Sequence, residues 1–270
     1  MRLDVGQAKQ KSRHRAEILR DETQCIYCDS TPATIEHMPP VGMFRHKHRP
    51  SGMEYASCLK CNKDTRAADA AASFFARISP TNDVDPTEVD EAYKLVGALA
   101  KLAPKAVREI FDDRKDKRIY AKGRDQLFGP KHEIKLDGPA VHALMVTFAA
   151  KLGMAIFRQH VGRSMTRGGV YTQHYFNSGL TKGTAKSILS ILPLQGELRQ
   201  GSVGSGRQFN YRYNTDEKSL VMAFCAFHDN LFIRVLAAEP SDSYKFMLDE
   251  YNANFVNFGE VADNAHVWQD

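Results

Sequence analysis

The stretch CIYCDSTPATIEHMPP (residues 25–40), together with CLKCNKDT (residues 58–65), decides how the first part of the chain folds. Each segment contains a C-x2-C pair, and 29 residues separate the two pairs. Two such pairs can present four thiolates to one tetrahedral Zn²⁺ at a Zn–S distance of about 2.3 Å. We therefore predict a structural zinc site with the ligands Cys25, Cys28, Cys58 and Cys61. A redox C-x-x-C motif is the alternative, although it would not need the second pair.

Zinc would compensate for a small core in this part of the chain. A structural zinc site can add on the order of 10 kcal/mol to folding, whereas a segment rich in proline and charge buries little apolar surface. Four thiolates leave no open coordination position, so the predicted site is structural. Zinc therefore explains neither Glu36 and His37 nor Asn62, which directly follows the last cysteine.

Composition predicts a soluble, cytoplasmic protein. Hydrophobic residues make up 43% of the 270 residues, which is enough for a core. Four of the five cysteines fall within residues 25–61, which is metal spacing and not a secreted disulfide framework. No apolar run approaches the roughly 20 residues of a membrane span, and the N-terminus lacks an apolar signal core. We expect no membrane partner.

The net charge of +5 is concentrated near the cysteines. Residues 1–80 contain 13 Lys and Arg against 9 Asp and Glu, and the remaining residues contain 24 against 23. A basic excess beside the motif favours a polyanion partner such as nucleic acid. An ordinary solvated charged surface would give the same pattern.

Periodicity predicts a mixed α+β chain in two parts. Pro80 and Pro86 interrupt the helical pattern, so we predict a zinc module over residues 1–80 and an α+β domain of unassigned role over residues 81–270. The predicted helices cover residues 7–21, 67–78, 88–113 (two helices, or one helix kinked at Pro104), 138–162 and 241–258. The predicted strands cover residues 207–214 and 219–239. Residues 113–136 read as a charged loop with a short hairpin.

The first cysteine pair, the run IEHMPP (residues 35–40) and CLKCNKDT at the start of a helix resemble the HNH endonuclease family. The resemblance covers roughly residues 22–78. It implies a treble-clef-like ββα-metal module that is braced by zinc. It also implies that His37 is the general base and that Glu36 and Asn62 bind a catalytic Mg²⁺ or Mn²⁺. Hydrolysis of a phosphodiester would leave a 5′-phosphate and a 3′-hydroxyl.

The chemistry of these side chains agrees with such roles. Imidazole has an unperturbed pKa of about 6.5 and is mostly neutral at pH 7, so it can accept a proton from water. Carboxylate and amide oxygens are hard ligands that suit Mg²⁺. Neighbouring strand residues face opposite sides, and Pro39 and Pro40 allow an irregular backbone just after His37. As alternatives, Glu36 and His37 are ordinary surface residues and Asn62 is a helix cap.

One position departs from the family pattern. Met53 stands where the family has its middle Asn, which in many members supports the active-site loop. Glu54, Tyr55, His46 or His48 are the candidate substitutes, and the sequence does not choose among them.

Basic side chains beside Asn62 are the candidates for binding the substrate phosphate. We predict this role for Lys60, Lys63 and Arg66 because they lie next to the motif. His46, His48 and the basic face of helix 7–21 read as solvated side chains, with phosphate contact as the alternative.

The resemblance and these residues predict a metal-dependent HNH endonuclease, with DNA favoured over RNA as the substrate, in restriction or anti-phage defence by analogy with the family. A single site would nick one strand, and double-strand cuts would require a homodimer. The alternatives are a non-catalytic zinc module that binds DNA or RNA, and an RNA-directed nuclease or toxin with the same site.

Overall fold

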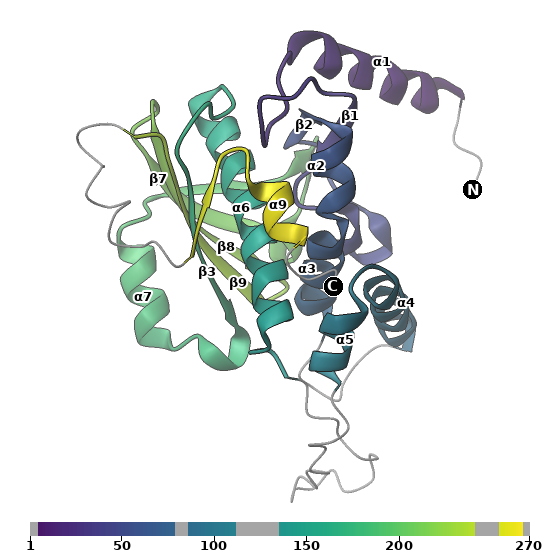
Figure 1. Cartoon of the computed structure of the whole chain (residues 1–270), viewed down its shortest axis with the longest axis vertical. Coiled ribbons are helices and arrows are strands. Elements are labelled where there is room, and N and C mark those ends of the chain that lie inside the picture. Colours follow the sequence, from purple (N-terminus) through teal and green to yellow (C-terminus); the bar gives the residue numbers. More distant parts are fainter. Residues whose placement is uncertain (1–4, 79–85, 112–134, 241–253, 267–270) are drawn as a thin grey trace, which may run out of the picture.

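The computed structural model describes residues 5–78, 86–111, 135–240 and 254–266, and its fold is mixed α+β, as predicted (Figure 1). Three layers lie side by side: an antiparallel sheet, the long helix α6 (Pro139–Val161), and the N-terminal segment with helices α2 to α5. The remaining helices are α1 (Val5–Asp21), α2 (Leu59–Asp64), α3 (Arg66–Arg77), α4 (Pro86–Leu102), α5 (Pro104–Ile110), α7 (Lys182–Ser190) and α9 (Val261–His266).

The main sheet has the strand order β10-β3-β9-β8-β7-β4, and every pair is antiparallel. Short connections join β7, β8 and β9, which are neighbours in both sequence and space. The strands are β3 (Gly169–Phe176), β4 (Leu194–Glu197), β7 (Asn210–Thr215), β8 (Leu220–Phe227), β9 (Leu231–Ala238) and β10 (Phe255–Asn257). A separate pair of two-residue strands, β5 (Arg199–Gln200) and β6 (Val203–Gly204), lies between β4 and β7 in the sequence.

The cysteine segment forms a β-hairpin followed by helices. Strand β1 (Thr34–His37) pairs antiparallel with β2 (Glu54–Ser57), so that His37 lies opposite Glu54. Helix α2 follows β2 directly, and Thr65 separates it from α3. The Thr65 hydroxyl donates to the carbonyl of Cys61 at 2.7 Å, which satisfies a carbonyl near the end of α2.

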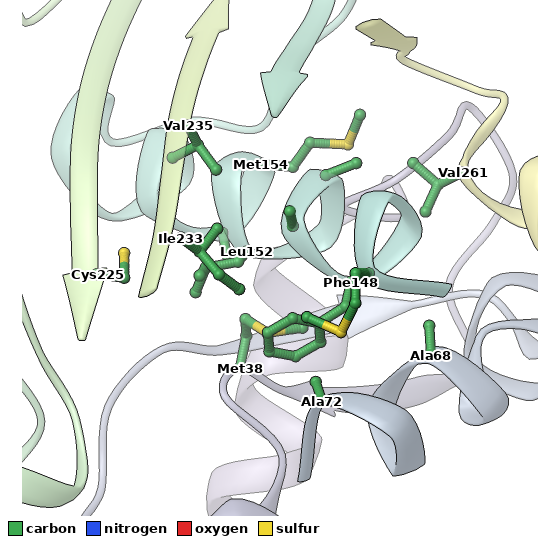
Figure 2. Packing of buried hydrophobic residues seen from close by; sticks show 14 of the residues in the cluster. Met38, Ala68, Ala72, Phe148, Leu152, Met154, Cys225, Ile233, Val235 and Val261 are labelled. Atoms are coloured by element: carbon green, nitrogen blue, oxygen red, sulfur yellow. The ribbon is translucent and has the colours of Figure 1, made fainter. Parts of the chain in front are cut away.

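One hydrophobic core joins the layers. Met38 and Ala72 of the N-terminal segment, Phe148 of α6 and Ile233 of β9 all belong to one cluster of buried residues (Figure 2). Because α6 is covered on both sides, it is apolar around most of its circumference. The predicted boundary at residue 80 therefore separates two sequence segments that share this core.

Helix α6 corrects one sequence expectation. By length and composition it could cross a membrane, so the expectation that no run approaches that length was wrong. In the structure 83% of its apolar window is buried inside the protein, as in the core helix of a soluble protein. Its close approach to β3 depends on Gly153, where a Cβ atom would lie 2.4 Å from a methyl group of Val170.

Most predicted elements are confirmed within the described residues. The helices α1, α3 and α6 and the strands β7, β8 and β9 lie where periodicity places them, and Pro104 divides the helical segment predicted over residues 88–113 into α4 and α5. The predicted last helix was wrong over Phe255–Asn257, which forms β10 and pairs with β3. The rest of that helix over residues 241–253, and residues 113–134 of the loop and hairpin predicted over residues 113–136, lie outside the described residues.

Candidate functional site

The four cysteines of the two knuckles converge on a site that can hold a metal ion. Their Sγ atoms all lie within 4.8 Å of one another. The Sγ of Cys28 lies 3.8 Å from that of Cys58 and 3.6 Å from that of Cys61. Sulfur atoms at the corners of a tetrahedron around zinc, at about 2.3 Å from the ion, are about 3.8 Å apart. The spacing therefore fits zinc, and among the described residues no other group of three His, Cys, Asp or Glu side chains converges in this way.

Local backbone geometry sets the cysteines in place. The N–H of Tyr27 donates to the Sγ of Cys25 at 3.4 Å, and the N–H of Cys61 donates to the Sγ of Cys58 at 3.3 Å. Cys58 is also the N-cap residue of α2. The second knuckle thus fixes the start of α2 directly after β2, and the N–H of Ile26 ties the first knuckle to the carbonyl of Ala56 in β2. A metal at this site would link the hairpin to the helix.

Glu36 points into the protein interior. Its side chain is 5% exposed, and its Oε2 atom lies 3.5 Å from the Nζ of Lys151 in α6. The same ammonium group donates to both carboxylate oxygens of Asp69 in α3, each at 2.7 Å. The pKa of Glu36 is raised to about 7, chiefly by burial and also by the charge of Asp69, whereas the ammonium group of Lys151 lowers it. The interior here holds two carboxylates and one ammonium group, which also lies 5.7 Å from the centre of the Tyr27 ring.

His37 is the last residue of β1 and is half-buried. Because successive strand residues face opposite sides, its ring lies on the other face of the hairpin from Glu36. A cis peptide bond joins Met38 to Pro39 immediately afterwards, where the sequence predicted an irregular backbone. Their successive positions in β1 thus direct Glu36 and His37 to opposite faces of the hairpin.

Asn62 lies inside α2 and is half-buried. Its N–H donates to the carbonyl of Cys58 at 3.1 Å, as an intrahelical bond. Since Cys58 is the N-cap, Asn62 is not the helix cap that was considered as the alternative.

The predicted phosphate contacts differ in their surroundings. Lys60 donates to the carboxylate of Asp263 in α9 at 2.5 Å, in an exposed ion pair. Lys63 and Arg66 are exposed, and the Nε of Arg66 donates to the carbonyl of Lys63 at 3.4 Å. His46 and His48 are exposed as well, and the ring of His46 lies 3.5 Å from the carboxylate of Glu91.

Arg49 is a buried cation that the sequence did not single out. Its side chain is 3% exposed and lies in the loop that joins β1 to β2. Burial lowers its pKa to about 10, so it remains charged at neutral pH. Its guanidinium donates to the carbonyls of five residues: Met38, Pro39, Pro50, Gly52 and Met53. No sequence pattern reveals this role, because the acceptors belong to the backbone.

Comparisons of the chain with protein-family models, with curated proteins and with solved structures found no match.

Proposed function

We propose that the chain hydrolyses phosphodiester bonds, as a zinc-braced ββα endonuclease in which His37 is the general base. The observation that carries the proposal is the arrangement of β1, β2 and α2. A hairpin is followed at once by a helix, four cysteines can link the two through a metal, and His37 ends the first strand. This order of elements agrees with the ββα-metal module that the HNH resemblance implies.

His37 can perform one step of such a reaction with its own atoms. A neutral imidazole nitrogen would take a proton from a water molecule as the water attacks phosphorus, and the imidazole would become a cation. The bond from phosphorus to the 3′ oxygen would break, and that oxygen would take a proton from solvent to leave a 3′-hydroxyl and a 5′-phosphate. The exposed cations Lys63 and Arg66, close along the chain to the motif residue Asn62, would attract the charged backbone of the substrate. The cation Lys60 would serve in this way only by leaving Asp263.

A divalent ion bound by Glu36 and Asn62 does not fit the described arrangement. Glu36 is buried, and the ammonium group of Lys151 is already the cation next to its carboxylate. We therefore assign no step to the ion. Mg²⁺ or Mn²⁺ stays the predicted cofactor, and binding through Glu36 would require its carboxylate to turn away from Lys151.

DNA is the proposed substrate class, with RNA as the nearest rival. The charges that favour nucleic acid lie on exposed side chains of α1, such as Arg13 and Arg15, as well as near the motif. Contacts of this kind are made with phosphates, which DNA and RNA share. A role in restriction or anti-phage defence, and a homodimer that cuts both strands, are proposals by analogy alone.

The test is cleavage of supercoiled plasmid, single-stranded DNA and RNA by the purified full-length chain. Reactions contain Mg²⁺, Mn²⁺ or no added divalent ion, and zinc content is measured in each, so that loss of zinc is not mistaken for loss of a catalytic ion. His37→Ala is compared with His142→Ala, which removes an exposed histidine from α6. We expect cleavage in the wild type and in His142→Ala only. Cleavage that persists in zinc-loaded His37→Ala would refute the mechanism.

A non-catalytic zinc module that binds nucleic acid is the second candidate. The observation that favours it is the burial of Glu36 against Lys151, because a decayed nuclease no longer needs that carboxylate to face a metal. Binding of DNA or RNA without cleavage under every ionic condition would select this candidate.

A further inference from the structure

The side chain of Arg49 binds both ends of the loop between β1 and β2, and the side chains of His228 and Gln208 bind the backbone of its middle, at Met43 and Arg45. The loop contains only two short 3-10 turns, at Val41–Met43 and Arg45–Lys47. The guanidinium of Arg49 reaches the carbonyls of Met38 (3.0 Å) and Pro39 (2.7 Å) at the start of this loop.

The same guanidinium also binds the end of the loop. It donates to the carbonyls of Pro50 (3.0 Å), Gly52 (2.7 Å) and Met53 (3.3 Å), and lies 3.5 Å from the carboxylate of Glu54. The planar fork of arginine can make several such bonds at once, and lysine cannot reproduce this geometry. One buried charge thus joins the two ends of the loop.

The residues that Arg49 contacts include the one that follows His37 in the chain and the one opposite it in the hairpin. Met38 directly follows it, and Glu54 is its partner across the hairpin. The N–H of Met38 donates to the carbonyl of Met53 at 3.0 Å, so the hairpin closes at the residues that Arg49 binds. Met53 itself has a positive φ of 49°, in the left-handed region that a bulky side chain seldom adopts. The Arg49 contacts hold this backbone in place.

We propose that Arg49 is the positioning residue of His37: its guanidinium fixes the backbone that follows the histidine and the backbone that faces it across the hairpin, and so fixes the direction of the ring. The inference rests on the proposed function, because it names the group that holds the general base. It also accounts for Met53 at the middle-Asn position, since Arg49 supports the loop, with Glu54 as the carboxylate beside its guanidinium. Arg49 acts through the backbone and touches no substrate.

The test compares Arg49→Lys and Arg49→Met with the matched control Arg163→Lys. Arg163 also binds a carboxylate and a carbonyl, those of Glu239 and Lys218, in the C-terminal part of the chain. Each full-length variant is measured for zinc content, thermal unfolding and cleavage kinetics. The Cε1–H resonance of His37, assigned by its loss in His37→Gln, is followed by NMR as the pH is raised.

We expect Arg49→Lys to retain zinc and to shift the His37 resonance. We expect kcat to fall about 10- to 100-fold, as for a misplaced catalytic group, with little change in KM. Arg163→Lys should leave the resonance and the kinetics unchanged. If Arg49→Met folds, it should show a larger resonance shift and a larger fall in kcat than Arg49→Lys. If it does not fold, the result for Arg49→Lys alone tests the inference.

Three results would overturn the inference. They are a zinc-loaded Arg49→Lys variant with an unmoved His37 resonance, a rise in KM at constant kcat, and loss of zinc with unfolding in Arg49→Lys. The last would show that Arg49 supports the whole module and not the histidine. If the wild type cleaves nothing, the proposed nuclease function fails, and the resonance alone still decides whether Arg49 positions His37.

Discussion

Glu36 offers the sharpest test of the interior beside the motif. Its carboxylate shares one ammonium group with Asp69, and Lys151 lies closer to Asp69. If both carboxylates are ionised, the cluster carries an excess negative charge in a low-dielectric interior. Glu36→Gln removes that excess and keeps the shape of the side chain. We therefore expect this variant to be more stable than the wild type above neutral pH.

The size and sign of the stability change follow from the pKa of Glu36. Burial raises the pKa of Glu36 from 4.5 to about 7, so the folded protein prefers the protonated form. The stability that this group supplies is complete below pH 4.5 and is lost as the pH rises through 7. At roughly 1.4 kcal/mol per pKa unit, the loss is about 2 kcal/mol at pH 6 and about 3 kcal/mol at pH 9. Glu36→Gln should escape this loss.

The assay is urea unfolding of zinc-saturated protein at pH 6, 7, 8 and 9, a range that limits acid release of zinc. The quantity compared is the difference in unfolding free energy between Glu36→Gln and the wild type. It should favour the variant and should grow by about 1 kcal/mol between pH 6 and pH 9. Glu17→Gln, on the exposed side of α1, is the control and should stay within about 0.5 kcal/mol of the wild type.

A variant that is less stable than the wild type, by an amount that grows with pH, would refute the reasoning. It would mean that Glu36 is ionised at neutral pH and that its attraction to Lys151 outweighs its burial. A constant difference across the range would mean that Glu36 does not titrate there.

Three further outcomes are expected. Lys151→Met should lower the unfolding free energy by about 3–5 kcal/mol, because it leaves buried carboxylates without a cation. Adding Asp69→Asn to Lys151→Met should recover part of that loss. Equal losses for the single and the double variant in urea unfolding would contradict this expectation. Cys58→Ser should remove zinc and lower the midpoint of thermal unfolding, and a strong chelator should do the same to the wild type. Full zinc content in the variant by metal analysis would contradict the four-cysteine zinc site. Gly153→Ala should lower the unfolding free energy by about 1–3 kcal/mol through overpacking. The control Gly97→Ala lies in α4, where a new Cβ meets nothing within 4 Å, and should not destabilise the protein. Similar unfolding curves for the two variants would contradict the close packing at Gly153.

The sequence predicts those features that depend on neighbouring residues. The knuckle cysteines lie close together because C-x2-C spacing and the start of α2 are local, and the apolar repeat marks α3 and α6. The strand β10 was missed because pairing with β3, far away along the chain, decides its conformation. Chain order alone cannot supply such a partner.

The interior of the site was hidden for the same reason. The role of Arg49 could not be read from the sequence, because it binds backbone carbonyls and any residue type offers one. Lys151 did leave a trace, as a charge in the middle of an apolar helix, but nothing in the sequence identifies Glu36 and Asp69 as its partners. Buried ion pairs join residues that are distant in sequence, so they appear only when the layers are assembled.

The cluster of Glu36, Asp69 and Lys151 bears on the role of the C-terminal part of the chain. Lys151 and Asp69 alone would neutralise each other, so stability alone does not call for a second carboxylate at position 36. A destabilising buried carboxylate is retained where the residue serves something other than folding. The three groups belong to β1, α6 and α3, so the strand that ends in His37 cannot shift without disturbing a buried charge on α6. Residues beyond the predicted boundary at 80 therefore help to set the position of the motif, and a truncated N-terminal module would lack the cation that its own carboxylates face.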